Sequence, residues 1–496
     1  MSEIRKKSIR GTTWIYVGFL VGALNVYLFT HKSWFASTEY GLTNSMRDIA
    51  ILVSAISTLG VPSFLSKFFP YYQDHTTYKE NDMLGFALKI SMAGFLIMAF
   101  LTWIGQPIII QKFGTKSPLL VEYFYFTLPM AFGYMLFSLL EAYSYGYHRS
   151  ILTNFLKEFL VRFYTLLVIL LKMAGLISFK AFIFLFVLQY LVIAAVLGFV
   201  LHREGKLPIN FKESRVTKRF KPKIYAMLFL TSTVIIAGAL RPTIDSLVIS
   251  SRIDLEHTAI FGFATFLMAT IQAPYRSVVS VVTPVLSRAW KDKNMHEIRK
   301  IYKRTSINLL TISLFVFFCI WLNFEEAIRV FNLKEEYVEG KWVVFIIGLT
   351  TIIEMGTGVN SQIIGSSTYW RFEFYTNLIL TVFIVLLSYL FTVKYGMIGP
   401  ALANLISFAV YNFIRYLFLK NKFGMQPFTR KTVEIIVGAV AIYYATYLIF
   451  RNVHGIFHLA GTLVFFTAFY FLLVYLRNIS PDLKPVLASI TKKFKK

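Results

Sequence analysis

The sequence predicts an all-α polytopic membrane protein of about 14 transmembrane helices, arranged as two pseudo-symmetric six-helix lobes followed by two further helices. Hydrophobic residues make up 56% of its 496 residues and charged residues only 15%, with a mean hydropathy of +0.61. A soluble domain carries about 25% charged residues. Apolar stretches of about 20 residues, the length that crosses a bilayer as a helix, recur along the chain. A strongly basic segment separates two sets of six such stretches.

The predicted helices follow the apolar stretches from one end of the chain to the other. The first comes directly after basic residues with no small-residue cleavage site, so we expect a retained helix and not a removed signal peptide. The predicted ranges are 9–30, 43–66, 84–110, 119–145, 151–172, 180–201, 224–250, 257–283, 305–322, 340–365, 371–393, 397–418, 431–450 and 455–477.

The basic segment 202–223 divides the chain into its predicted parts, because it carries eight Lys and Arg against two Glu. It connects an N-lobe, residues 1–201, with a C-lobe, residues 224–422. Residues 423–496 hold the last two helices and a Lys-rich tail, TKKFKK, which we expect to anchor at the membrane surface. The two halves resemble each other weakly, and parallel repeats of this kind place a substrate path between the lobes.

Lys and Arg concentrate in alternate loops, among them 67–83, 284–304 and 415–431. The positive-inside rule puts these loops and both termini in the cytoplasm. The net charge of +26 therefore indicates contact with anionic membrane lipids and not with nucleic acid. The longest loop of the opposite set, 323–339, is too small for a catalytic domain.

Three stretches of the sequence resemble one family. The first stretch is similar to the first two helices of polysaccharide and O-antigen flippases and consists of IRGTTWIYVGFL and WFASTEYGLTNSMRDIAILVSAISTLGVPSFLSKFFP. The second stretch, residues 244–305, is similar to helices seven and eight of these flippases with the basic loop beyond them. Residues 360–424 are similar to helices eleven and twelve. The chain thus resembles the lipid-linked oligosaccharide flippases of the MATE-like MOP exporter superfamily.

The resemblance implies alternating access of two lobes and no enzymatic activity. It implies that the substrate is an undecaprenyl-diphosphate-linked oligosaccharide of the O-antigen or capsule type, as used in lipopolysaccharide and polysaccharide biosynthesis. It also implies the bacterial cytoplasmic (inner) membrane as the location and polysaccharide polymerase or assembly proteins as partners. A monomer would suffice, because each lobe is the partner of the other.

Arginines within the predicted helices are the main candidates for binding a lipid diphosphate. A charge at mid-bilayer is costly and indicates function, and Arg stays protonated and meets phosphate oxygens bidentately. Arg162 lies near mid-depth of the fifth helix with Glu158 four residues before it, and Arg241 and Asp245 have the same spacing. Arg276 has no such neighbour, whereas the two spaced pairs could simply neutralise themselves and fix helix packing.

Two further cations and two further acids complete the candidate site. Arg47 and Lys67 lie toward the ends of the second helix, where they could bind diphosphate or extend to the interface. Asp48 and Glu354, together with Asp245 and Glu158, are candidates for coupling to H⁺ or Na⁺, since a carboxylate in a low-dielectric site can titrate near neutral pH. Glu354 has no basic residue three or four positions away, so it is the preferred candidate for ion coupling.

The sequence offers no other site. Its eight His lack metal-ligand spacing, its one cysteine is Cys319, and it has no P-loop, so we expect no cofactor and no metal. The alternatives are a multidrug or cation antiporter and a lipid II flippase of the same superfamily, a membrane sugar polymerase or ligase, and a scaffold. The basic excess in the helices disfavours the antiporter, and the short external loops disfavour the polymerase.

Overall fold

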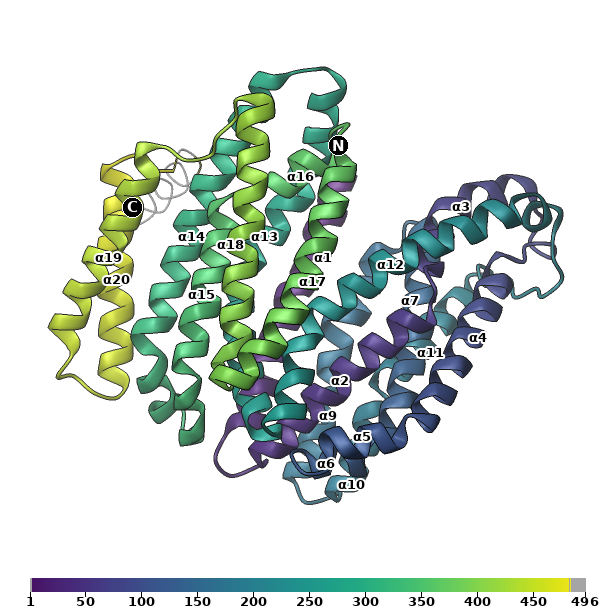
Figure 1. Ribbon diagram of the computed structural model, residues 1–496, viewed down its shortest axis with the longest axis horizontal. Helices are drawn as coiled ribbons and strands as arrows, with labels where there is room; N and C mark the ends of the chain where they lie inside the picture. Colours follow the sequence, from purple (N-terminus) through teal and green to yellow (C-terminus); the bar gives the residue numbers. More distant parts are fainter. Residues whose placement is uncertain (1, 481, 483–496) are drawn as a thin grey trace. The chain divides into compact units, whose positions relative to one another are not determined.

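The computed structural model describes residues 2–480 and 482, and every regular element in this part of the chain is a helix (Figure 1). The chain forms two compact units, Met1–Ala259 and Ile260–Lys496. The sequence-based lobe boundaries at 202–223 remain a prediction. The predicted all-helical class is confirmed.

In the first unit, α2 packs against α4, α7 and α12, while α1 packs against the irregular helix formed by α8, η2 and α9. The element η2 is a single π-helical stretch. The helices of this unit are α1 (Ser2–Thr30), α2 (Ser37–Ser57), α3 (Val61–His75), α4 (Met83–Ile104), α5 (Gln106–Phe113), α6 (Pro118–Glu122), η1 (Phe124–Phe126), α7 (Thr127–Gly146), α8 (Ser150–Asn154), η2 (Phe155–Leu160), α9 (Val161–Met173), α10 (Phe179–Val187), α11 (Gln189–Arg203) and α12 (Arg215–Arg252).

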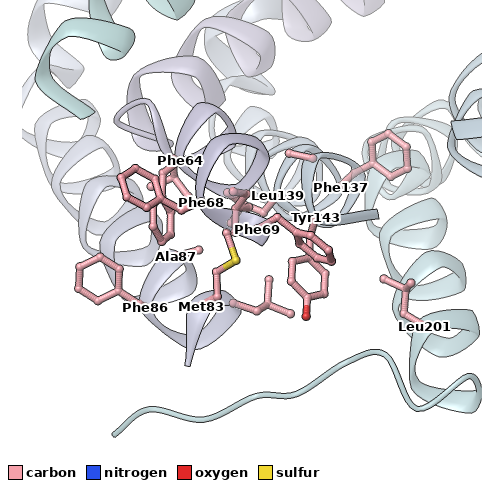
Figure 2. Packing of buried hydrophobic residues seen from close by; sticks show 14 of the residues in the cluster. Phe64, Phe68, Phe69, Met83, Phe86, Ala87, Phe137, Leu139, Tyr143 and Leu201 are labelled. Carbon is pink, nitrogen blue, oxygen red and sulfur yellow. The ribbon is translucent and has the colours of Figure 1, made fainter. Parts of the chain in front are cut away.

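An aromatic core joins α3, α4 and α7 in this unit. Figure 2 shows Phe64 and Phe69 of α3 close to Phe86 of α4 and Tyr143 of α7, and all four are buried. A Cβ at Gly146 would lie 2.4 Å from the Phe69 ring, so only glycine lets this ring reach α7. The packed rings therefore join α3 to α4 and α7.

In the second unit, α18 packs against α15 and α17, and α14 packs against α15 on one side and α19 and α20 on the other. The helices α19 and α20 form an antiparallel pair near the C-terminus (Figure 1). The elements of this unit are α13 (Leu255–Lys291, which begins in the first unit), α14 (Met295–Val330), η3 (Glu335–Gly340), α15 (Lys341–Gly356), α16 (Asn360–Gly365), α17 (Trp370–Tyr395), α18 (Ile398–Phe423), α19 (Arg430–Phe450) and α20 (Ile456–Leu476).

Each of the fourteen predicted segments overlaps one helix or a broken series of helices. In the described part of the chain, nine helices are long and apolar enough to cross a membrane, or ten if α2 and α3, bent by 48°, form one span. The protein is thus a multi-pass membrane protein. The predicted tail anchor, 491–496, lies outside the described residues.

Several predicted loops are wrong, because charged residues continue the helices. The helix α12 begins at Arg215, inside the predicted connector, and α14 extends to Val330 in the predicted external loop. The helix α18 extends to Phe423, beyond the predicted end at residue 418. Lys, Arg and Glu are good helix formers, whereas hydropathy marks only the apolar part of a helix.

Candidate functional site

Close packing of α1 on η2 brings polar groups together in the first unit. A Cβ at Gly18 would lie 2.1 Å from the carbonyl oxygen of Glu158, and one at Gly22 would lie 3.1 Å from Cδ of Arg162. The Gly-x-x-x-Gly spacing lets the two helices approach closely. One turn further along α1, Asn25 donates from Nδ2 to the carbonyl oxygen of Arg162 at 2.8 Å. Packing of α1 therefore fixes the backbone that presents Arg162.

The predicted pair of Glu158 and Arg162 is present as an ion pair. Nη2 of Arg162 lies 3.1 Å from Oε2 of Glu158, and the two side chains are 33% and 23% exposed. Glu158 lies in the π-helical stretch, and π-bulges inside α-helices often mark functional sites because the extra residue redirects the side chains around it. The pair is held by packing and remains accessible.

Two tyrosines lie within reach of the same charges. The rings of Tyr134 on α7 and Tyr190 on α11 are 4.6 Å apart. Tyr190 interacts electrostatically with Arg47, Lys157 and Arg162, and the guanidinium of Arg47 also lies 6.0 Å from the ring of Phe186. Residues from four helices thus meet around one pair of aromatic rings.

A second ion pair extends this group. Nζ of Lys157 lies 3.4 Å from Oε2 of Glu141, and Tyr145 donates to the other oxygen of Glu141 at 2.9 Å. With Asp48, which interacts electrostatically with Arg47, three carboxylates accompany the three cations. We call the following residues the unit 1 cluster: Arg47, Tyr134, Glu141, Lys157, Glu158, Arg162 and Tyr190.

Two of the predicted coupling acids come together between α2 and α12. The side chain of Asp48 forms a hydrogen bond with Ser246, and it interacts electrostatically with both Arg47 and Asp245. Asp245 is buried, and Arg241 lies half-buried one turn before it on α12. The two carboxylates are thus close enough to influence each other's charge.

The remaining predicted residues lie on other elements. Arg276 is exposed on α13, and Glu354 is half-buried near the end of α15. Lys67 is exposed and lies within α3. The helix α2 ends before Thr58, and α3 then continues to His75, well beyond Lys67. The sequence prediction had ended the helix beside Lys67.

Sequence reasoning missed a buried polar network in the second unit. Arg415 of α18 forms an ion pair with Glu373 of α17, and these side chains are 4% and 12% exposed. Ser361 and Asn377 each donate to Oε1 of Glu373 at 2.7 Å. The guanidinium of Arg415 stacks 3.6 Å from the ring centroid of Tyr411.

The network extends to the break between α15 and α16. Asn412 accepts hydrogen bonds from Thr357 at 2.9 Å and from Asn360 at 3.0 Å. Gly358 between them has a φ of +66°, and a Cβ there would lie 3.0 Å from the backbone nitrogen of Ser306. We call the following residues the α16–α18 network: Thr357, Asn360, Ser361, Glu373, Asn377, Tyr411, Asn412 and Arg415.

A broken helix with polar groups at the break is common in transporters, where unwound segments line a substrate or ion path. The signal that could have located this one is the run TGVNSQ, polar and glycine-containing within an apolar stretch. Arg415 and Glu373 are 42 residues apart on different helices. No spacing rule for a single helix connects them.

Both units thus consist of long apolar helices that carry charged residues, as in a polytopic membrane protein. Residues 232–390 match the MatE family. A comparison with curated protein sequences finds no match.

Solved structures resemble this one over most of the chain. The lipid II flippase MurJ, in an inward closed conformation, has a TM-score of 0.74 at 15% identity and covers 95% of this chain and 98% of its own. An inward-facing multidrug resistance MATE family transporter of the MOP superfamily has a TM-score of 0.63 at 15% identity, covering 83% of this chain and 94% of its own.

A MOP superfamily transporter from Pyrococcus furiosus has a TM-score of 0.55 at 14% identity, covering 84% of this chain and 96% of its own. These likenesses establish a MATE/MurJ-like fold, the fold of the MOP superfamily transporters. The matched proteins are transporters and a flippase, in agreement with the prediction that this chain is not an enzyme.

Proposed function

We propose that the protein is a flippase that moves an undecaprenyl-diphosphate-linked oligosaccharide across the bacterial cytoplasmic membrane by alternating access, with both termini in the cytoplasm. The observation that carries the proposal is the gathering of three cations, Arg47, Lys157 and Arg162, around the ring of Tyr190. A lipid diphosphate brings about two negative charges into a region of low dielectric. A cationic cluster offsets that cost.

Arg162 is the central residue of this proposal. Its guanidinium keeps its charge at any physiological pH and can donate two parallel hydrogen bonds to phosphate oxygens. The ion pair with Glu158 neutralises it while no substrate is bound, and an arriving phosphate competes with that carboxylate for the same donors. The Tyr134 and Tyr190 rings beside it offer flat apolar faces for a sugar.

Arg241 and Arg276 would act as further phosphate ligands, and Arg47 and Lys67 would receive the headgroup nearer the membrane surfaces. Asp48 and Asp245, which interact with each other, support a role in ion coupling, because one of two neighbouring carboxylates takes up a proton or cation readily. Glu354 and Glu158 remain further coupling candidates.

The second candidate substrate is lipid II, favoured by the likeness to the lipid II flippase MurJ over 95% of the chain. Lipid II is also an anionic lipid diphosphate, so the same arginines would serve. The likeness to a multidrug transporter favours a third candidate, a cation antiporter, but the three cations around Tyr190 disfavour a cationic drug at this place.

Flipping in proteoliposomes tests the proposal directly. Fluorescent undecaprenyl-diphosphate oligosaccharide and fluorescent lipid II are compared for the wild type and for Arg162→Gln, Arg241→Ala and Arg276→Ala. The matched control is Arg288→Ala, which removes an exposed arginine from the same helix as Arg276. A charge-assisted hydrogen bond is worth about 1.5–3 kcal/mol, so we expect roughly a 10-fold loss or more for each site variant and none for the control.

Each outcome decides between the candidates. Flipping of lipid II alone would assign the chain to the second substrate. Equal flipping by the wild type and all three site variants would overturn the cationic site. If the wild type flips neither lipid and transports an organic cation instead, the flippase proposal itself is wrong.

Topology is tested separately with single cysteines. The chain has one free cysteine, Cys319, so Cys319→Ser gives a background without thiols in the described residues. We expect Lys293→Cys to react with an impermeant maleimide only from the cytoplasmic side and Glu336→Cys only from the outside. The opposite pattern would overturn the proposed orientation.

A further inference from the structure

The second unit contains a pocket that the proposed function does not use. It has a volume of about 380 Å³ and is lined by α13, α14 and the chain after α20. One wall is apolar, formed by Val278, Val281, Val282 and Ile301. Lys300 and Arg304, which lie one turn apart on the same face of α14, also line the pocket.

The pocket already contains an anionic group of the protein itself. The carboxylate of Asp482 forms an ion pair with Arg304 and accepts a hydrogen bond from Nδ2 of Asn308 at 2.5 Å. Both side chains of the ion pair remain partly exposed, at 44% and 42%. Arg304 and Asn308 of α14 therefore already hold an oxyanion at a partly exposed place.

The segment before Asp482 is anchored to two helices. Ser480 donates to Oδ1 of Asn308 at 2.6 Å, and Lys431 of α19 donates to the carbonyl oxygen of Asn478 at 2.5 Å. Ile479 is fully buried. The anchoring positions the carboxylate at the mouth of the pocket, independently of its ion pair.

Asp482 keeps its charge at neutral pH. Partial burial raises the pKa of its carboxyl group, but hydrogen bonds from Arg304 and Asn308 outweigh burial and hold the pKa below its usual value. Because the folded-state pKa is lowered, the contact is fully present at neutral pH and is lost only as the pH falls through that value. Another anion that binds Arg304 and Asn308 must therefore displace an ionised carboxylate.

We propose that this pocket binds the phosphate headgroup of an anionic membrane lipid, and that Asp482 competes with the lipid for Arg304 and Asn308. Basic pockets between membrane helices are suited to anionic headgroups, and the valine wall accepts the first methylenes of an acyl chain. Lys300 makes no ion pair with a described residue and is available to the incoming phosphate. The carboxylate of Glu297 also lines the pocket and repels negative charge, so the site favours a headgroup with one phosphate charge over a headgroup with several.

Native mass spectrometry of the full chain, released from nanodiscs of phosphatidylcholine with or without phosphatidylglycerol, tests the proposal. Asp482→Asn removes the competing charge, and we expect it to bind phosphatidylglycerol about 1.4–5-fold more tightly, because a partly exposed ion pair is worth about 0.2–1 kcal/mol. In the Asp482→Asn background, Lys300→Gln and Arg304→Gln should each lower the affinity several-fold. Lys303→Gln, an exposed cation of α14 that does not line the pocket, should leave it unchanged.

Equal losses from Lys303→Gln and Arg304→Gln would show a non-specific charge effect and overturn the pocket. Unchanged binding in Asp482→Asn would overturn the competition. Inorganic phosphate is tested in parallel, and displacement of phosphatidylglycerol by low millimolar phosphate would assign the pocket to the free anion instead of a lipid. The test does not depend on the transported substrate, so it stands if the flippase proposal fails.

Discussion

The Glu158–Arg162 pair of the first unit and the Glu373–Arg415 pair of the second unit have the same chemistry in opposite settings. The first pair lies on one continuous helical segment and is 23% and 33% exposed. The second joins two helices and is 12% and 4% exposed, with further hydrogen bonds to the same carboxylate. An accessible pair can exchange its partner for a substrate phosphate, whereas a buried pair that carries further hydrogen bonds holds a structure together.

The energetic expectations differ accordingly. An accessible pair contributes about 0.2–1 kcal/mol because water competes for both groups. Removing one partner of a buried pair costs about 3–5 kcal/mol, since the other charge is left without compensation. We therefore assign the α16–α18 network to stability of the broken helix and the unit 1 cluster to substrate charge. The following predictions test this assignment, from the largest expected effect to the smallest.

The largest effect should come from breaking the buried pair. We expect Arg415→Met to lower the free energy of unfolding by about 3–5 kcal/mol, because Glu373 would lose its counter-charge in a buried site. Thermal unfolding in detergent, followed by the fluorescence of native tryptophans, measures the loss. The double variant Arg415→Met with Glu373→Gln should recover most of it, because no buried charge then remains.

Failure of this rescue would contradict the assignment. If the double variant is as unstable as Arg415→Met, the arginine contributes mainly through its packing on Tyr411, 3.6 Å away. If both variants are as stable as the wild type but inactive, the α16–α18 network serves transport and the comparison is reversed.

An intermediate effect should come from the close contact of α1 with η2. We expect Gly18→Ala to destabilise the protein by about 1–3 kcal/mol, because the new Cβ would lie 2.1 Å from the backbone oxygen of Glu158, which cannot move aside alone. The matched control is Gly238→Ala in α12, where a Cβ has nothing within 4 Å. Thermal unfolding should show a loss for the first variant and no loss for the second; equal curves would mean that α1 is not held in this register.

The difference between the two pairs also explains what the sequence could predict. Apolar stretches of bilayer length predicted the helical class and the approximate place of every segment. The i, i+4 spacing predicted the Glu158–Arg162 pair, because two residues one turn apart on a helix share a face whatever surrounds them. These are local properties, and local properties can be read from the sequence.

The α16–α18 network is not local. Glu373 lies near the N-terminus of α17 and Arg415 lies toward the C-terminus of α18. These two ends meet only because the helices pack antiparallel, so the contact depends on that pairing. Hydropathy placed Arg415 inside the predicted helix 397–418, but nothing in that pattern pairs it with Glu373. The contact of Asp48 with Ser246 likewise depends on the packing of α2 on α12, which no pattern within either helix specifies.

The smallest effect on stability should come from Glu158→Gln, and its effect on transport separates the two pairs most sharply. The pair is partly exposed, and an amide can still accept from Arg162, so we expect a loss of only about 0.2–1 kcal/mol in unfolding free energy. The same change frees the guanidinium from its competing carboxylate, and the apparent affinity for the lipid diphosphate should rise several-fold.

Flipping rates measured over a range of substrate densities give that affinity. The matched control is Glu141→Gln, which removes a cluster carboxylate that pairs with Lys157 instead. Tighter binding only in Glu158→Gln would identify Arg162 as the group that receives the phosphate. Unchanged binding together with a stability loss near that of Arg415→Met would mean that both pairs are structural and that the substrate charge is met elsewhere.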